Sequence, residues 1–313
     1  MRPKLLQHGR LPPALESRLA QAYDVHPLWA ETDPQDFLAE RGGEFTALTT
    51  SAISGVSEAL MVALPSLGVI SSLGVGLDKI DLEAARKRGI AVGYTPDGLN
   101  DCVADTAFAL LMDVARRISA GDRFVRKGEW PNRPFPLSTR VSGKRIGLVG
   151  MGRIGRVIAR RGTGFDMSVR YHSRRPVTDV PYQYLASLVE LAEWADFLVI
   201  ATAGGPETEH LVNAGVLDAL GQKGYLINIA RGTVVDDAAL IDALQSGRIA
   251  GAGLDVFANE PHVPEALFGL DNVVLLPHVA SATEETRQAM GELFLENLAS
   301  FFSSGRPKAS ALD

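Results

Sequence analysis

The chain has 313 residues, enough for two domains, and its 46% hydrophobic and 22% charged content is that of an ordinary globular protein. Its net charge of −6 argues against a nucleic-acid partner, because phosphate binding depends on basic patches. The single cysteine, Cys102, excludes an internal disulfide and a cysteine-based metal cluster, and we expect no metal site. The N-terminal residues lack a signal-like apolar run and no apolar stretch reaches membrane-spanning length, so we expect a cytoplasmic protein with no membrane partner.

Short apolar segments alternate with amphipathic ones in the first hundred residues, which is typical of a parallel α/β fold. The predicted strands are residues 4–7, 47–50, 69–72 and 90–93, and the predicted helices are residues 11–22, 57–64 and 81–89. A turn-rich break, "YTPDGLND", follows at residues 94–101. After it, "VADTAFALLMDVARRI" predicts a long helix over residues 103–118.

The alternation of apolar and amphipathic segments is more regular in residues 144–276. Its predicted strands are residues 144–150, 167–172, 197–201, 225–230, 249–257 and 272–276, and its predicted helices are residues 153–162, 185–194, 213–220 and 236–247. Near-continuous apolar runs of this kind suit strands that are covered on both faces. The last helix, roughly residues 283–302, starts with "SATE" (residues 281–284), which resembles a capping box of Ser281 with Glu284, and we expect it to pack on the first domain.

The resulting fold class is α/β with two Rossmann-like, doubly wound domains and an active-site cleft between them. The smaller domain is discontinuous and comprises residues 1–97 and 285–313, which would bind the substrate. The larger domain comprises residues 98–284 and would bind the cofactor. In a doubly wound sheet, ligands bind beyond the carboxyl ends of the strands.

A glycine-rich loop marks the larger domain as a dinucleotide-binding domain. Gly150, Gly152 and Gly155 form a G-x-G-x-x-G pattern between a predicted strand and a predicted helix. The first glycine permits a tight turn, the second lets backbone N–H groups approach a pyrophosphate, and the third allows close packing of helix on strand. The pattern alone is weak evidence, and its context strengthens it; we expect Arg153 and Ile154 to belong to the same binding loop.

The turn about twenty residues later indicates which dinucleotide. An acidic residue that binds the ribose hydroxyls of NAD is usual there, whereas this chain has His172, Ser173, Arg174 and Arg175 in "VRYHSRRP". Such a turn standing alone would be a solvated basic loop. At the ribose position it favours NADP(H), because arginine binds phosphate through charge-assisted hydrogen bonds.

Three charged residues follow successive predicted strands of the same sheet. Arg231 comes after residues 225–230, Glu260 after residues 249–257, and His278 after residues 272–276. Taken singly, Arg231 could be a structural ion-pair partner and Glu260 a surface carboxylate. Together they supply an anion clamp, a proton donor and a carboxylate that supports the donor.

With these pieces in place, the chain resembles the D-isomer-specific 2-hydroxyacid dehydrogenase family over nearly its whole length. The matching segments are "SSLGVGLDKIDLEAARKRGIAV", "VADTAFALLM", "GKRIGLVGMGRIG", "LINIARGTVVDDAAL", "GAGLDVFANEP" and "LLPHVASAT". Within the family, the turn "YHSRRP" is similar to that of NADPH-dependent glyoxylate/hydroxypyruvate reductases and of hydroxyphenylpyruvate reductases. The resemblance implies NADPH-dependent reduction of small 2-oxo acids and a homodimer with an arm at residues 116–136.

The resemblance also implies roles for individual residues. Arg231 would bind the substrate carboxylate and carbonyl oxygen, His278 would act as general acid, and Glu260 would hold its tautomer and favour the imidazolium. The other implied contacts are the backbone N–H groups of Leu73, Gly74, Val75 and Gly76 for the substrate carboxylate, Ile229, Ala230 and Asp255 for the nicotinamide carboxamide, and Thr106 for the cofactor phosphate or ribose.

Other readings stay open. An aromatic 2-oxo acid reductase, such as one for hydroxyphenylpyruvate, would need a roomier substrate pocket. An NAD-dependent D-2-hydroxyacid dehydrogenase is disfavoured by the arginine turn. A dinucleotide-sensing protein is compatible with the fold and is disfavoured by the set Arg231, Glu260 and His278. Trp130 could line a substrate pocket or pack on a surface arm.

Overall fold

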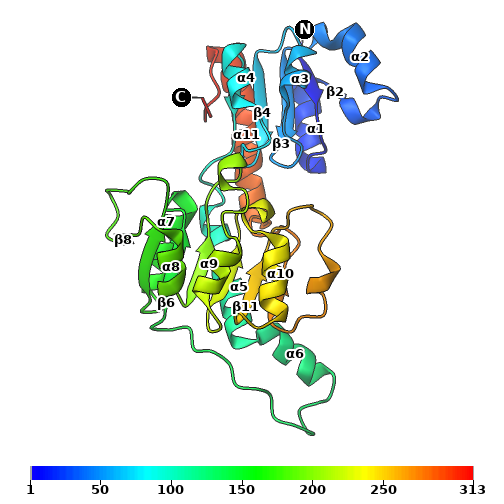
Figure 1. Cartoon of the computed structure of the whole chain (residues 1–313). Coiled ribbons are helices and arrows are strands. Elements are labelled where there is room, and N and C mark those ends of the chain that lie inside the picture. The colour runs from blue at the N-terminus through cyan, green and yellow to red at the C-terminus, as the bar shows by residue number, and fades with distance from the viewer. Residues whose placement is uncertain (1, 313) are drawn as a thin grey trace. The chain divides into compact units, whose positions relative to one another are not determined.

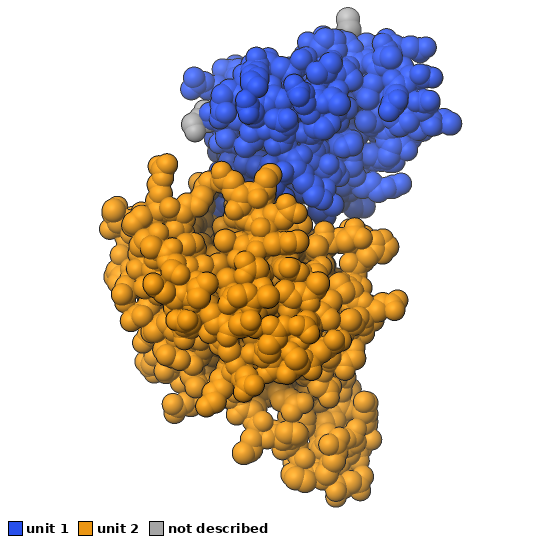
Figure 2. All heavy atoms as spheres, in the orientation of Figure 1, with its two compact units in different colours: residues 1–99, 283–313 blue, residues 100–282 orange. Residues whose placement is uncertain are grey.

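The computed structural model describes residues 2–312 and contains two compact units (Figure 2). Unit 1 consists of residues 1–99 and 283–313, and unit 2 of residues 100–282. The domain crossings predicted from the sequence, after residue 97 and before residue 285, each lie two residues from these boundaries. Each unit is built on one parallel sheet, so the predicted α/β class with two doubly wound domains is confirmed.

Unit 1 has a five-stranded parallel sheet in the order β2-β1-β3-β4-β5. The strands are β1 (Lys4–Gln7), β2 (Asp24–Pro27), β3 (Ala47–Ser51), β4 (Val69–Leu73) and β5 (Ala91–Gly93). The helices are α1 (Pro13–Ala22), α2 (Pro34–Arg41), α3 (Glu58–Val62), α4 (Leu82–Lys87) and α11 (Glu284–Ser304). Side chains of α2, α3 and α4 share one apolar core with one face of the sheet, and α11 packs against β4 and β5 as expected.

Unit 2 has a seven-stranded parallel sheet in the order β12-β11-β10-β9-β6-β7-β8. The strands are β6 (Arg145–Val149), β7 (Ser168–His172), β8 (Gln183–Tyr184), β9 (Phe197–Ile200), β10 (Tyr225–Asn228), β11 (Gly251–Leu254) and β12 (Val273–Leu275). The helices α5 (Asn100–Arg116) and α7 (Arg153–Thr163) cover one face, and α8 (Leu188–Trp194), α9 (Ala214–Leu220) and α10 (Asp237–Gln245) cover the other (Figure 1). All strands are parallel, and the strand order changes direction at β6, because β7 and β8 lie on one side of it and β9 to β12 lie on the other. The carboxyl end of β6 is therefore the switch point where ligands bind in such sheets.

Burial of the central strands explains why their positions could be predicted from sequence. Every residue of β9, β10 and β11 is buried, because helices cover both faces, and their sequences are accordingly continuous apolar runs. Two strands, β2 and β8, lack such a run and were missed, and so were two α-helices, α2 and α6 (Ile118–Arg126). β2, for example, has the sequence "DVHP" and forms only because it pairs with β1 at the sheet edge.

The predicted cap of the last helix was wrong. The helix α11 begins at Glu284, and its N-cap is Thr283, whose hydroxyl accepts a hydrogen bond from the N–H of Thr286. Ser281 therefore lies outside the helix, two residues before the cap. Ser281 and Thr283 lie only two residues apart and each has a side chain suited to capping, so the sequence left the cap ambiguous.

Candidate active site

The glycine-rich loop has the conformation that a pyrophosphate site requires. Gly150 has φ of +104°, and a Cβ there would lie 2.7 Å from the carbonyl oxygen of Ala201. A Cβ on Gly155 would lie 2.2 Å from the carbonyl oxygen of Gly150, so only glycine lets α7 approach the loop this closely. No described side chain caps the N-terminus of α7, and its first turn holds no acidic residue. Its exposed N–H groups and positive dipole end therefore suit an anion.

Hydrogen bonds to backbone carbonyl groups brace the basic turn after β7. His172 uses Nδ1 to contact the carbonyl oxygen of Leu185 at 3.0 Å, and Ser173 donates its hydroxyl to the carbonyl oxygen of Arg175 at 2.6 Å. The hydroxyl of Tyr184 donates to the carbonyl oxygen of Ser173 at 3.2 Å. These bonds brace the turn and leave the side chains of Arg174 and Arg175 exposed at the carboxyl edge of the sheet.

Arg231 is positioned by a residue that the sequence reasoning missed. Asn228, the last residue of β10, is 1% exposed; its side-chain oxygen accepts from the N–H of Ala230 and its Nδ2 donates to the carbonyl oxygen of Arg231 at 2.9 Å. The next residue, Gly232, lies so close to β11's loop that a Cβ would sit 1.8 Å from the carbonyl carbon of Phe257. A polar residue ending an apolar strand, as in "LINIARG", was the available signal.

Glu260 and His278 form a hydrogen-bonded pair. The distance from His278 Nδ1 to Glu260 Oε2 is 2.7 Å, and the other carboxylate oxygen of Glu260 accepts the N–H of Phe257 at 3.0 Å. The carboxylate therefore selects the tautomer with the proton on Nδ1. Nε2 is then the ring nitrogen that can gain and release a proton.

The electrostatic surroundings keep Glu260 ionised. Burial by itself raises the pKa of this carboxyl, but the hydrogen bonds from His278 and Phe257 and the positive charges of His278 and Arg231 lower it below the usual value. The guanidinium of Arg231 thus acts on the same carboxylate that binds His278. A carboxylate, an imidazole and a guanidinium gathered in this way can bind an anionic substrate and transfer a proton to it.

Asp255 holds the loop that carries His278. Its carboxylate oxygens accept the N–H groups of Val279 and Ala280 at 2.8 and 3.0 Å, and its carbonyl oxygen accepts the N–H of His278. Burial raises the pKa of Asp255, while the two N–H groups partly oppose the rise. The bonds stabilise His278 at φ of +53°, a conformation that few non-glycine residues adopt.

Two other expected contact groups are engaged within the protein. The hydroxyl of Thr106 on α5 donates to the carbonyl oxygens of Cys102 and Ala280, which ties this helix to the His278 loop. In unit 1, the N–H of Gly74 donates to the hydroxyl of Thr95 at 2.9 Å. Arg231, Asp255, Glu260 and His278 lie in unit 2, whereas Leu73 to Gly76 lie in unit 1.

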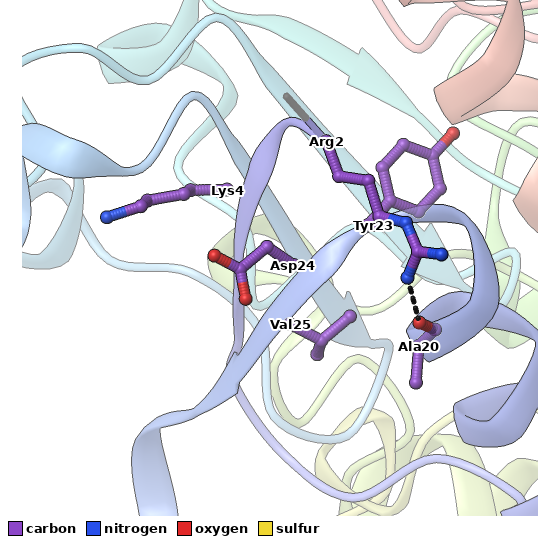
Figure 3. Close-up of a pocket in the computed structure, with 6 residues that line it drawn as sticks. All are labelled: Arg2, Lys4, Ala20, Tyr23, Asp24 and Val25. Atoms are coloured by element: carbon purple, nitrogen blue, oxygen red, sulfur yellow. Dashed lines mark hydrogen bonds between the residues drawn. The ribbon is translucent and has the colours of Figure 1, made fainter.

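A separate hollow lies in unit 1 where β1 and β2 begin (Figure 3). Gly74 follows the carboxyl end of β4, which in this parallel sheet is the opposite end of the strands. The volume of the hollow is about 690 Å³ and its lining consists of Arg2, Lys4, Ala20, Tyr23, Asp24 and Val25. Arg2 donates to the carbonyl oxygen of Ala20 and Lys4 pairs with Glu44, so the cations that line it already have partners. The hollow contains none of the residues expected to bind cofactor or substrate.

Residues 2–312 contain neither a metal-binding cluster nor a membrane-spanning helix. No cluster of three or more histidine, cysteine, aspartate and glutamate side chains there could hold a metal ion. No helix in that range combines the length and the apolar composition that crossing a membrane would require.

Comparison with known proteins gives consistent relatives for the whole chain. Residues 108–280 match the family model described as the NAD binding domain of D-isomer specific 2-hydroxyacid dehydrogenase. The chain is 47% identical over 293 residues to hydroxyphenylpyruvate reductase of Plectranthus scutellarioides, covering 94% of this chain and 93% of that protein. It is 46% identical over 289 residues to glyoxylate/hydroxypyruvate reductase A of Arabidopsis thaliana, with 92% of both chains covered.

A solved structure extends the similarity to the fold. The NADPH-dependent glyoxylate/hydroxypyruvate reductase of Sinorhizobium meliloti, solved with NADP and malonate, is 42% identical to the chain. The match covers 99% of this chain and 97% of that one, with a TM-score of 0.91. On the strength of the matched family model, the near-complete coverage of these relatives and the shared fold, the chain belongs to the D-isomer specific 2-hydroxyacid dehydrogenase family.

Proposed function

We propose that the chain is an NADPH-dependent reductase that converts small 2-oxo acids, glyoxylate and hydroxypyruvate, to D-2-hydroxy acids. The observation that carries the proposal is the 2.7 Å hydrogen bond between His278 and Glu260, formed at the carboxyl edge of a sheet that also presents Arg231. The relatives support the substrate class, because two of those named above are glyoxylate/hydroxypyruvate reductases. The exposed arginines after β7 support NADPH as the cofactor.

The residues present fit a dinucleotide. In this proposal the N–H groups of the loop from Gly150 to Gly155, including Arg153 and Ile154, bind the pyrophosphate at the N-terminus of α7. His172, Ser173, Arg174 and Arg175 would hold the ribose 2′-phosphate. The backbone at Ile229 and Ala230, with Asp255, would hold the nicotinamide carboxamide, and Thr106 stays a predicted contact. When bound, the cofactor supplies the hydride for the reduction.

The protein side of the reaction follows from the three charged groups. The guanidinium of Arg231 binds the substrate carboxylate and carbonyl oxygen and stabilises the negative charge that grows on that oxygen. His278 donates a proton from Nε2 to the same oxygen as general acid, while Glu260 accepts the hydrogen bond from Nδ1 and stabilises the imidazolium. Contacts between the substrate and the loop from Leu73 to Gly76 remain a prediction.

The test is a panel of 2-oxo acids, glyoxylate, hydroxypyruvate, pyruvate, phenylpyruvate and hydroxyphenylpyruvate, each assayed with NADPH and with NADH. The proposal requires the highest kcat/KM for glyoxylate or hydroxypyruvate with NADPH, and a product of D configuration. The 47% identity to a hydroxyphenylpyruvate reductase makes an aromatic substrate the second candidate, and faster turnover of hydroxyphenylpyruvate would favour it. Absence of NADPH oxidation with every acid would refute a reductase.

Cofactor choice has its own test in Arg174→Ala. We expect this variant to raise KM for NADPH far more than KM for NADH, because only NADPH carries the phosphate that the guanidinium would bind. Equal losses with both cofactors would show that Arg174 does not recognise the 2′-phosphate.

We further propose that the enzyme is a homodimer. The helix α6 is followed by an irregular segment (Figure 1). Large apolar side chains of this region are exposed: Ile118 (54%), Val125 (55%), Trp130 (68%) and Leu137 (99%). Exposed apolar side chains gathered along one segment are typical of a protein interface. Light scattering on the purified protein would give the mass, and a monomer at micromolar concentration would contradict the proposal. A cytoplasmic location stays a prediction, which cell fractionation would test.

A further inference from the structure

We propose that Glu207 is a specificity-determining residue of the cofactor site: its carboxylate competes with the 2′-phosphate for Arg174 and so reduces the preference for NADPH over NADH. The inference rests on the proposed function, in which Arg174 binds that phosphate. It starts from an ion pair of 2.8 Å between Arg174 Nη1 and Glu207 Oε2.

The ion pair joins two loops on either side of the glycine-rich loop. Arg174 lies in the turn after β7, and Glu207 lies on the short 3-10 helix η3 (Pro206–Thr208) that follows β9. Between β7 and β9 in the sheet lies β6, which leads into Gly150. The pair therefore connects the loops that follow the strands on both sides of β6, the strand at the switch point.

Glu207 is held near Arg174 by its own loop. The hydroxyl of Thr208 donates to the carbonyl oxygens of Ala203 and Gly205 at 2.9 and 3.1 Å, which closes the turn around Glu207. At Gly204 a Cβ would lie 2.6 Å from Cγ of Arg231, so the loop also packs against the stem of Arg231. These contacts restrict where the backbone of Glu207 can lie.

Arg174 is held in a similar way by the bonds within the basic turn, in which Ser173 donates to Arg175 and Tyr184 donates to Ser173. Because hydrogen bonds already restrict both turns, the ion pair mainly requires the ordering of two side chains. The carboxylate of Glu207 therefore competes with any bound phosphate for the guanidinium of Arg174.

A phosphate that binds Arg174 either displaces the carboxylate of Glu207 or binds beside it. Either Glu207 leaves the guanidinium, and the ion pair is lost, or it stays, and two anions share one cation at close range. Both outcomes weaken binding of the 2′-phosphate, whereas a ribose with a free 2′-hydroxyl brings no second anion. The effect is modest, because the two side chains are 85% and 75% exposed and solvent screens the pair.

The experiment compares Glu207→Gln with the wild-type protein by calorimetry and by kinetics. The binding probes are adenosine 2′,5′-bisphosphate, which carries the 2′-phosphate, and 5′-AMP, which lacks it. We expect the variant to bind the bisphosphate about three- to fivefold more tightly, as an exposed ion pair allows, with no gain for 5′-AMP. The ratio of KM for NADH to KM for NADPH should rise by the same factor, and the gain should shrink at high salt.

Two further variants make the test specific. Glu209→Gln removes an equal charge from an exposed carboxylate two residues away, and we expect it to change neither affinity. In an Arg174→Ala background, Glu207→Gln should give no gain, because the cation for which the carboxylate competes is absent. A gain that persists there, a gain equal to that of Glu209→Gln, or weaker binding of the bisphosphate by Glu207→Gln would each overturn the inference.

The outcome also separates this inference from the proposed function. A wild-type protein that binds no bisphosphate and oxidises no NADPH would refute both. A wild-type protein that does both, with Glu207→Gln unchanged, would refute the role of Glu207 alone.

Discussion

The substitution Gly152→Ala should weaken cofactor binding without destabilising the fold. Gly152 has φ of −77° and ψ of −162°, a conformation open to any residue, and no atom lies within 4 Å of the Cβ that alanine would add. The substitution therefore costs the fold nothing, and the reduced freedom of the unfolded chain raises the free energy of unfolding by about 0.4–1 kcal/mol.

The same methyl group should obstruct the cofactor. It projects beside the N-terminus of α7, where a pyrophosphate must approach the backbone to about 2.9 Å to accept its hydrogen bonds. Losing one charge-assisted hydrogen bond costs about 1.5–3 kcal/mol, so we expect the Kd for NADPH to rise by about tenfold to hundredfold. Calorimetric titration with NADPH gives the Kd, and urea denaturation gives the free energy of unfolding.

Two glycines provide controls. At Gly269, also in unit 2, no atom lies within 4 Å of an added Cβ, and Gly269→Ala should leave the Kd for NADPH unchanged. At Gly155 the added Cβ would lie 2.2 Å from a backbone oxygen, so Gly155→Ala should instead destabilise the fold by about 1–3 kcal/mol. An unchanged Kd in Gly152→Ala would refute the placement of the pyrophosphate.

Three other substitutions test the candidate active site. His278→Ala should reduce kcat by about a hundredfold to ten-thousandfold with little change in the Kd for NADPH, and substantial remaining turnover would contradict a role as general acid. Glu260→Gln should move the pH profile of reduction to lower pH, because the neutral amide no longer stabilises the imidazolium; an unmoved profile would argue against the pair. The pKa of Glu260 lies below its usual 4.5, so the ionised carboxylate stabilises the fold fully above about pH 4.5 and loses this contribution as the pH falls through the lowered pKa. The difference in the free energy of unfolding between wild type and Glu260→Gln should therefore narrow on acidification. Asn228→Ala should raise KM for the 2-oxo acid and lower the unfolding free energy by about 1–3 kcal/mol, because buried N–H and C=O groups beside Arg231 lose their partner; an unchanged KM would show that Asn228 does not position Arg231.

The parts of this protein that could be predicted from sequence are those whose pattern is local. A strand covered on both faces must be apolar along its length, so β9, β10 and β11 were visible as runs. The glycine-rich loop was visible because a positive φ at Gly150 and a close backbone contact at Gly155 require glycine at a fixed spacing. Arg231, Glu260 and His278 were candidates because each follows a strand of one parallel sheet, whose carboxyl ends share an edge.

Contacts between distant residues were decided only by the tertiary structure. The strand β2 carries no apolar run and depends on its pairing with β1, and the bonds of Asn228 to Arg231 and of Asp255 to the His278 loop have no signature in spacing. Glu207 lies 33 residues after Arg174 and was one exposed carboxylate among many until the fold placed it within 2.8 Å of that guanidinium. Sequence pattern specifies which face of an element is buried, whereas the partner of an exposed or hydrogen-bonding side chain depends on how loops from separate strands meet.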